Sequence, residues 1–169
     1  MKKKTVLAVY DTYTDVQDAL EALTKNGIDK QHISVVGKGN EKVMNDFEYN
    51  KENKDILFWG ELGTFWGGLF GFLVGGLFFF VPGFGPLIAT GPLTAALAGT
   101  VGGAMLGGAI TALSAALIDW GLSEEEAIKY ENYVKDNKFL LIVHGDDSQT
   151  EKAKELLDQL GKGSVTLHQ

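Results

Sequence analysis

The chain has 169 residues, of which 45% are hydrophobic and 22% are charged, and its formal net charge is −7. It contains no cysteine, which excludes disulfides, thiolate metal ligands and cysteine nucleophiles. All 15 basic residues are lysines, and the acidic balance argues against a nucleic-acid partner, because proteins that bind nucleic acid usually present a basic patch.

The charges divide the chain into two parts. Residues 62–118 form a run of 57 without a single charge, so every basic and acidic residue lies outside it. We therefore expect a charged soluble domain built from residues 1–55 and 121–169, interrupted by an apolar insertion at residues 56–120. The apolar stretch after the N-terminal lysines is too short for a signal peptide, which places this soluble domain in the cytoplasm.

The elements predicted for the soluble domain follow the order β-α-β before the insertion and α-β-α-β after it. Three helix starts are predicted from capping boxes, in which a Ser or Thr precedes a Gln or Glu by three residues. Residues 139–143 are apolar throughout and are expected at the centre of the sheet, whereas residues 33–36 and 164–168 are expected at its edges. The predicted strands are Thr5–Tyr10, Ile33–Val36, Phe139–Val143 and Ser164–His168, and the predicted capping boxes are Thr14–Gln17, Ser123–Glu126 and Ser148–Glu151.

This order of elements predicts an α+β fold. Two right-handed βαβ-type units around one sheet indicate a ferredoxin-like sandwich, with an additional helix before the third strand. The insertion lies between the second and third strands, so both of its ends must emerge on the same side of the domain.

The insertion is predicted to be a transmembrane or intramembrane helical hairpin. Residues 56–80 contain no proline, and a helix of 25 residues would be ~37 Å long, enough for the ~30 Å hydrocarbon core of a bilayer. Residues 93–120 form a second long helical stretch. Between them, residues 81–92 hold all three prolines and are the expected tip. The tip residues are Pro82, Gly83, Gly85, Pro86, Gly91 and Pro92.

Small residues recur at every fourth position in both predicted membrane helices, which keeps them on one face. Such a glycine zipper lets helices approach closely in a bilayer. A second ridge of small residues on the second helix indicates contact with another copy of the chain. Trp59 and Trp120 flank the hairpin and are expected at the membrane interface. The predicted helix-packing residues are Gly63, Gly67, Gly71, Gly75, Gly99, Gly103 and Gly107.

Two motifs are distinctive. The first is the tip, Val81-Pro-Gly-Phe-Gly-Pro-Leu-Ile-Ala-Thr-Gly-Pro92, and the second is Gly121-Leu-Ser-Glu-Glu-Glu-Ala-Ile-Lys-Tyr-Glu131. Both are similar to motifs of the bacterial heat- or low-temperature-induced general stress proteins, and the similarity extends to the first two strands. The resemblance implies a stress-associated, membrane-linked bacterial protein and supplies no catalytic residues.

Little in the sequence indicates catalysis or metal binding. His144 and His168 end strands, and Asp146 and Asp147 lie near them in the chain, so these groups could ligate a metal ion. We favour the simpler interpretation that they are strand-end and loop residues, with Asp147 or Ser148 capping a helix. No Ser/His/Asp arrangement has a supporting context, and residues 62–118 hold no ionisable group. We therefore predict no enzyme activity, no cofactor and no metal.

The predicted function is structural. We expect a homo-oligomeric protein of the cell membrane, with lipid and other copies of itself as partners, that scaffolds, stabilises or curves the membrane. Two alternatives stay open. In one, the soluble domain senses a small ligand in a concave polar pocket on its sheet and the hairpin only anchors it. In the other, the glycine-lined helices assemble into a pore.

Overall fold

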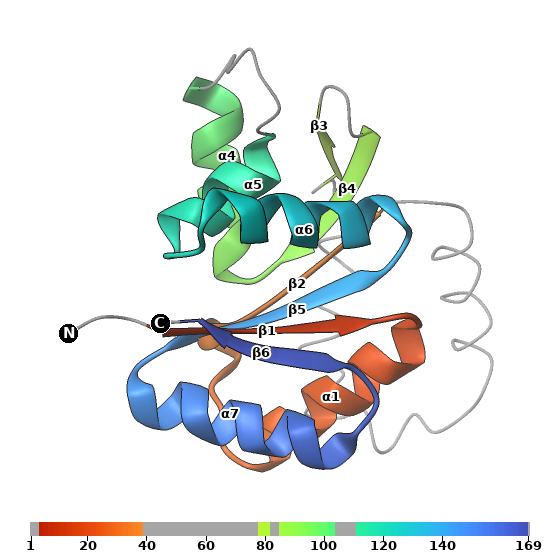
Figure 1. Ribbon diagram of the computed structural model, residues 1–169, viewed down its shortest axis with the longest axis vertical. Helices are drawn as coiled ribbons and strands as arrows, with labels where there is room; N and C mark the ends of the chain where they lie inside the picture. The colour runs from red at the N-terminus through yellow and green to blue at the C-terminus, as the bar shows by residue number, and fades with distance from the viewer. Residues whose placement is uncertain (1–3, 39–77, 82–84, 104–110, 169) are drawn as a thin grey trace.

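Six strands form one sheet, and helices cover both of its faces (Figure 1). The computed structural model describes residues 4–38, 78–81, 85–103 and 111–168. Its strands are β1 (Lys4–Tyr10), β2 (Ile33–Lys38), β3 (Phe78–Val81), β4 (Gly85–Thr90), β5 (Phe139–Gly145) and β6 (Ser164–His168). Its α-helices are α1 (Tyr13–Lys25), α4 (Pro92–Gly103), α5 (Ala112–Asp119), α6 (Glu124–Lys135) and α7 (Asp147–Leu160), and a 3-10 turn, η1, spans Lys30–His32.

The strand order is β3-β4-β2-β5-β1-β6, and every neighbouring pair is antiparallel. β5 lies at the centre beside β2, and it pairs with the interior strand β1 along its whole length, from Lys4 opposite Gly145 to Tyr10 opposite Phe139. The central position predicted for the apolar strand 139–143 is therefore confirmed. The four strands predicted from the sequence keep the order β2-β5-β1-β6, which is that of a split βαβ arrangement, and the predicted α+β class is confirmed.

Helices α1 and α7 cover one face of the sheet. Their apolar residues recur at intervals of three and four, which places them on the side of each helix that meets the strands. The charged residues of both helices occupy the other sides, as expected for helices with one face in water. The cluster between these helices and the sheet includes Val6, Ala8, Val16, Ala19, Leu20, Leu23, Leu141, Val143, Ala153 and Leu157.

The opposite face is covered by α4, α5 and α6. Helices α4 and α5 come from the charge-free run, and their leucines are fully buried against the strands. The expected single helix over residues 93–120 is therefore wrong in its described part, because Thr111 has an extended backbone and is the N-cap from which α5 begins. This second cluster includes Leu7, Val9, Val36, Leu93, Leu97, Leu113, Ala116, Leu117, Ala127, Val134, Leu140 and Ile142.

A β-hairpin occupies much of the segment predicted as a membrane tip. β4 pairs with β3 on one side and with β2 on the other. Pro86 is opposite Phe80, but the pairing with β2 begins only at Leu87, opposite Lys38. The missing N–H of proline therefore leaves the ladder to β2 intact. The prediction that residues 81–92 form a turn between two membrane helices is wrong for 85–90, which are a strand.

The same pairing corrects the predicted edges of the sheet. β2 was expected at an edge, yet it lies between β4 and β5. β6 pairs only with β1 and is an edge strand of the described sheet, as predicted.

Two of the three predicted helix starts are displaced. The N-cap of α1 is Thr12, whose hydroxyl accepts from the Asp15 amide, and the N-cap of α7 is Asp146. Both starts lie two residues before the predicted ones. The capping box of α6 is confirmed, since Ser123 and Glu126 each accept from the other's backbone N–H. Helix caps can be displaced in this way because neighbouring polar residues compete for the same orphan amides.

Among residues 4–38, 78–81, 85–103 and 111–168, no helix combines the length and the apolar character needed to cross a bilayer. Of the first predicted membrane helix, residues 78–80 belong to β3, and the others lie outside the described residues.

The covering role of α5 is testable with Leu117→Ala. Leu117 is fully buried, so truncation leaves a cavity, and we expect the free energy of unfolding to fall by about 2–5 kcal/mol. Urea unfolding followed by circular dichroism measures the change. Leu156→Ala, at a partly buried position on α7, is the control and should cost less. An unfolding midpoint of Leu117→Ala equal to that of the wild type would contradict the packing of α5 on the sheet.

Candidate functional site

Charge-free elements converge on one end of the sheet. Gly37 of β2 and Phe78 of β3 are both level with Ile88, the β4 residue between them. Their Cα atoms are therefore two strand spacings apart, roughly 10 Å. β3 and β4 continue past the end of β2 as far as the Val81–Gly85 pair. The hairpin thus projects beyond the end of β2.

Helix α4 returns to this end of the molecule. The chain reverses after β4 at Gly91, which has φ +75° and whose Cβ would lie 2.1 Å from the Ile33 carbonyl oxygen, so glycine is required there. Pro92 follows as the first helical residue, a position where its missing N–H is harmless. The Leu93 amide donates to the Ser34 hydroxyl at 3.1 Å and fixes the start of α4 on β2. We call β3, β4 and α4 the charge-free end; they rise together at the top of Figure 1.

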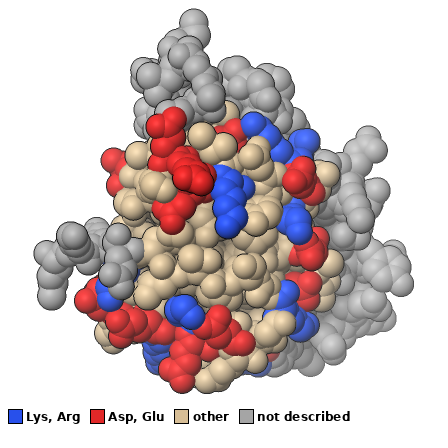
Figure 2. All heavy atoms as spheres, in the orientation of Figure 1, with Lys and Arg blue, Asp and Glu red and all other residues tan. Residues whose placement is uncertain are grey.

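The charge-free end differs chemically from the rest of the surface. α4 has no charged residue; Leu93 and Leu97 face the core, while Ala95 is exposed. A helix without a charged side usually has apolar surroundings on more than one of its own faces. By contrast, acidic residues and lysines gather over α6 and α7 in Figure 2.

A buried carboxylate joins α5 to α6. Glu131 of α6 is 2% exposed, and its Oε2 accepts from the hydroxyl of Thr111 at 2.7 Å and from that of Ser114. Its Oε1 lies 2.6 Å from the Lys135 Nζ. Thr111 is also the N-cap of α5, and its hydroxyl oxygen accepts from the Ser114 amide. The carboxylate therefore faces the N-terminus of α5, where the helix dipole favours negative charge.

The environment of Glu131 keeps it ionised. Burial acts to raise the pKa of this carboxyl, but the hydrogen bonds from Lys135, Ser114 and Thr111 outweigh burial and hold the pKa below its usual value. Sequence reasoning missed this residue. A signal was present, because Glu131 shares the helix face of Ala127 and Val134, both buried, and is therefore a charge at an apolar position.

Trp120, predicted at the membrane interface, lies at the other end of the sheet. Its carbonyl accepts from the Thr5 hydroxyl at 3.2 Å, and that hydroxyl makes a second hydrogen bond with His144 Nδ1 at 2.9 Å. The indole stacks on the His144 imidazole with ring centroids 4.8 Å apart. Trp120 thus joins the end of α5 to β1 and β5. Its predicted counterpart, Trp59, lies outside the described residues.

His168 ties the edge strand β6 to α6. Its Nε2 is 2.9 Å from the Tyr130 hydroxyl, and its Nδ1 is 3.1 Å from the Glu126 carboxylate. Burial raises the pKa of Tyr130, so this phenol stays protonated at neutral pH. His144 and His168 both pair with Thr5, from opposite sides of β1. No group of three or more His, Asp or Glu able to hold a metal ion occurs in the described part of the chain.

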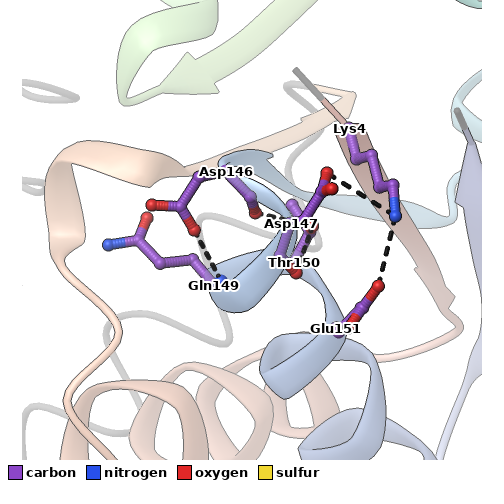
Figure 3. A network of polar contacts seen from close by, with 6 residues as sticks. All are labelled: Lys4, Asp146, Asp147, Gln149, Thr150 and Glu151. Carbon is purple, nitrogen blue, oxygen red and sulfur yellow. Dashed lines mark hydrogen bonds and ion pairs between the residues drawn. The ribbon is translucent and has the colours of Figure 1, made fainter. Parts of the chain in front are cut away.

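The acidic residues after β5 have structural partners (Figure 3). Asp146 accepts from the Gln149 amide at 2.8 Å as the N-cap of α7. Lys4 lies 3.5 Å from the Asp147 carboxylate and 3.1 Å from that of Glu151. Both acids are largely exposed, so these ion pairs contribute little to stability. This arrangement favours the capping interpretation of these acids, with Asp146 as the cap.

The predicted helix-packing and tip residues are divided by the structure. Gly99 and Gly103 lie in α4, and Gly85 and Pro86 begin β4. Gly91 connects β4 to α4, and Pro92 is the first residue of α4. Those outside the described residues are Gly63, Gly67, Gly71, Gly75, Pro82, Gly83 and Gly107.

Comparison with known proteins gives one match. Residues 5–77 match the model of a family described as the heat induced stress protein YflT domain. The matched region includes β1, α1 and β2 and ends directly before β3. It supports the resemblance to bacterial general stress proteins. Neither the curated proteins nor the solved structures gave a match.

The Glu131 contacts predict a pH-dependent stability difference between the wild type and Glu131→Gln. The lowered pKa means that ionised Glu131 stabilises the fold fully above the usual carboxyl value of 4.5, and that this contribution is lost as pH falls through the lower native pKa. At pH 7 we expect the variant to lose about 1–3 kcal/mol of unfolding free energy. Urea titrations from pH 7 to pH 3 should show the difference shrinking with acid. A difference that does not change with pH would contradict this assignment.

Proposed function

We propose that this chain is a stress-associated structural protein that attaches to the cell membrane by its charge-free end and assembles there with copies of itself. The charged helices α1, α6 and α7 of the α+β domain would remain at the cytoplasmic surface. Scaffolding or stabilising the membrane is the role that this arrangement fits.

The observation that carries this proposal is the convergence at one end of the sheet. β2 ends at residue 38 at this end, and β3 begins here at residue 78, level with Gly37. The charge-free run from residue 62 is therefore attached at this end of the domain. The sequences of β3, β4 and α4 also hold no charged residue. An uncharged group of two strands and a helix, with Lys38 at the end of β2 beside it, is suited to lie against a bilayer, because apolar groups leave water while a lysine ammonium can reach the polar headgroups.

The family description supports the stress association. It names a heat induced stress protein domain, and the match covers residues 5–77, the region that leads into the charge-free end. The glycines at every fourth position from Gly63 to Gly75 would allow close helix packing between copies in lipid.

The two alternatives fit the geometry less well. A ligand sensor with a pocket on the sheet requires an open sheet face, whereas helices cover both faces of the described sheet. A pore for ions requires polar groups along its path, and residues 62–118 contain no ionisable side chain.

Flotation of the full-length chain with phosphatidylcholine vesicles tests membrane attachment. We expect the wild type to float with the vesicles. Ala95→Glu adds a charge to the exposed side of α4, and because a buried charge in lipid costs about 2.5–3.5 kcal/mol, the bound fraction should fall at least about tenfold. Asn132→Glu adds the same charge to the exposed side of α6 and should float like the wild type. A wild-type chain that stays at the bottom of the gradient would overturn the proposal.

Chemical cross-linking of the vesicle-bound chain tests self-assembly. We expect dimers or larger species at protein-to-lipid ratios low enough to prevent random collisions. Monomer alone would contradict the homo-oligomer while leaving the flotation result unaffected.

A further inference from the structure

We propose that Glu131 is a latch that holds α4 and α5 on the sheet, and that opening it frees these two apolar helices, whose single charged residue is Asp119 at the end of α5, for the bilayer. This inference rests on the proposed function, since it supplies a regulated closed state for the membrane-attached end. The latch is a single carboxylate on α6 that receives hydroxyl groups from the start of α5.

The two helices are held to the rest of the fold mainly by apolar contacts. Leu93 and Leu97 of α4 and Leu113 and Leu117 of α5 are fully buried in the cluster over β1, β2 and β5. Apolar contacts lack direction, and a bilayer can replace them at little cost, because lipid tails are as apolar as leucine. The polar contacts of α5 therefore distinguish the sheet-bound arrangement from a lipid-bound one.

Glu131 is placed to make that distinction. It is a charged side chain at 2% exposure, and a buried carboxylate that loses its donors is strongly destabilised unless water reaches it. With α5 in place, Thr111 and Ser114 supply the donors; with α5 released, water would take their place. The hydrogen bonds of the Glu131 carboxylate are therefore complete in two states, one with α5 bound and one with α5 released into water. A partial displacement of α5 would break the hydrogen bonds to Thr111 and Ser114 before water could replace them.

Few polar groups surround the Glu131 carboxylate, so the effect of a Glu131 substitution on α5 can be assigned to this carboxylate. Lys135, one turn further along α6, is the charged group that faces the carboxylate. From α5 come two hydroxyls, and from the strands beneath α6 come the apolar residues Val36, Leu140 and Ile142. Because α5 donates two hydrogen bonds to a charged acceptor, neutralising Glu131 weakens both of them without removing packing volume.

Hydrogen exchange of the full-length chain without lipid tests the latch. In Glu131→Gln at pH 7, amides of α4 and α5 should accelerate at least about tenfold more than those of β1, β5 and α7, whose exchange rises only with the loss of global stability. Glu125→Gln removes a charge from the exposed side of the same helix and should leave all rates unchanged. If Glu131→Gln does not fold, Ser114→Ala removes one donor and should give a smaller acceleration in the same peptides.

Two results would overturn the latch. One is unchanged exchange of α4 and α5 in Glu131→Gln, or in Ser114→Ala where that variant is used. The other is an equal acceleration in all elements, which would make Glu131 a general stabilising residue.

Flotation of the same variant separates this inference from the proposed function. Faster exchange in α4 and α5 with an increased vesicle-bound fraction supports both. Faster exchange without binding to phosphatidylcholine vesicles supports the latch and contradicts the membrane role. Vesicle binding by the wild type with unchanged exchange in Glu131→Gln overturns the latch and leaves the membrane role standing.

Discussion

The fold depends on two central strands that are apolar on both sides. β1 places Leu7 and Val9 on one face and Val6 and Ala8 on the other, and β5 does the same over residues 139–143. A sheet of this kind cannot leave either face in water, because each exposed face would forfeit the hydrophobic stabilisation of several large side chains. One cover comes from α1 and α7, which flank the strands in the chain. The other includes the helices of the charge-free run, and this requirement explains why α4 and α5 lie on the sheet.

The periodic parts of the chain were predictable and the uniformly apolar part was not. In α1, the apolar residues at 16, 19, 20 and 23 contrast with polar neighbours, so both the helix and its buried face could be predicted. In residues 85–103 no such contrast exists. Leu87 and Leu93 could be buried equally well by a sheet, by another helix or by lipid. The sheet buries them here because of β2. Its edge pairs with β4, and its apolar side chains pack against α4.

Prolines and glycines were misleading for a related reason. Pro86 indicates a break when it is considered alone, yet in β4 it sits just outside the ladder to β2, where its missing N–H has no consequence. The small residues of α4 are spaced as in packed membrane helices, and the same spacing also permits close packing on a sheet. Glu131 was the reverse case, since a charge among apolar positions marked a buried polar contact that composition alone did not reveal.

Gly37 and Phe78 are both opposite Ile88, and this position lets the segment between β2 and β3 vary independently of the sheet. The chain leaves the sheet at Lys38 and re-enters it at Phe78, so the two ends of the segment between them are held only two strands apart. The entropy of closing such a loop grows only with the logarithm of its length, about 0.6 kcal/mol for each doubling. The intervening segment can therefore lengthen, shorten or change composition in the course of evolution with little effect on the register of the sheet. One scaffold could in this way carry membrane-attaching segments of different depth and bulk.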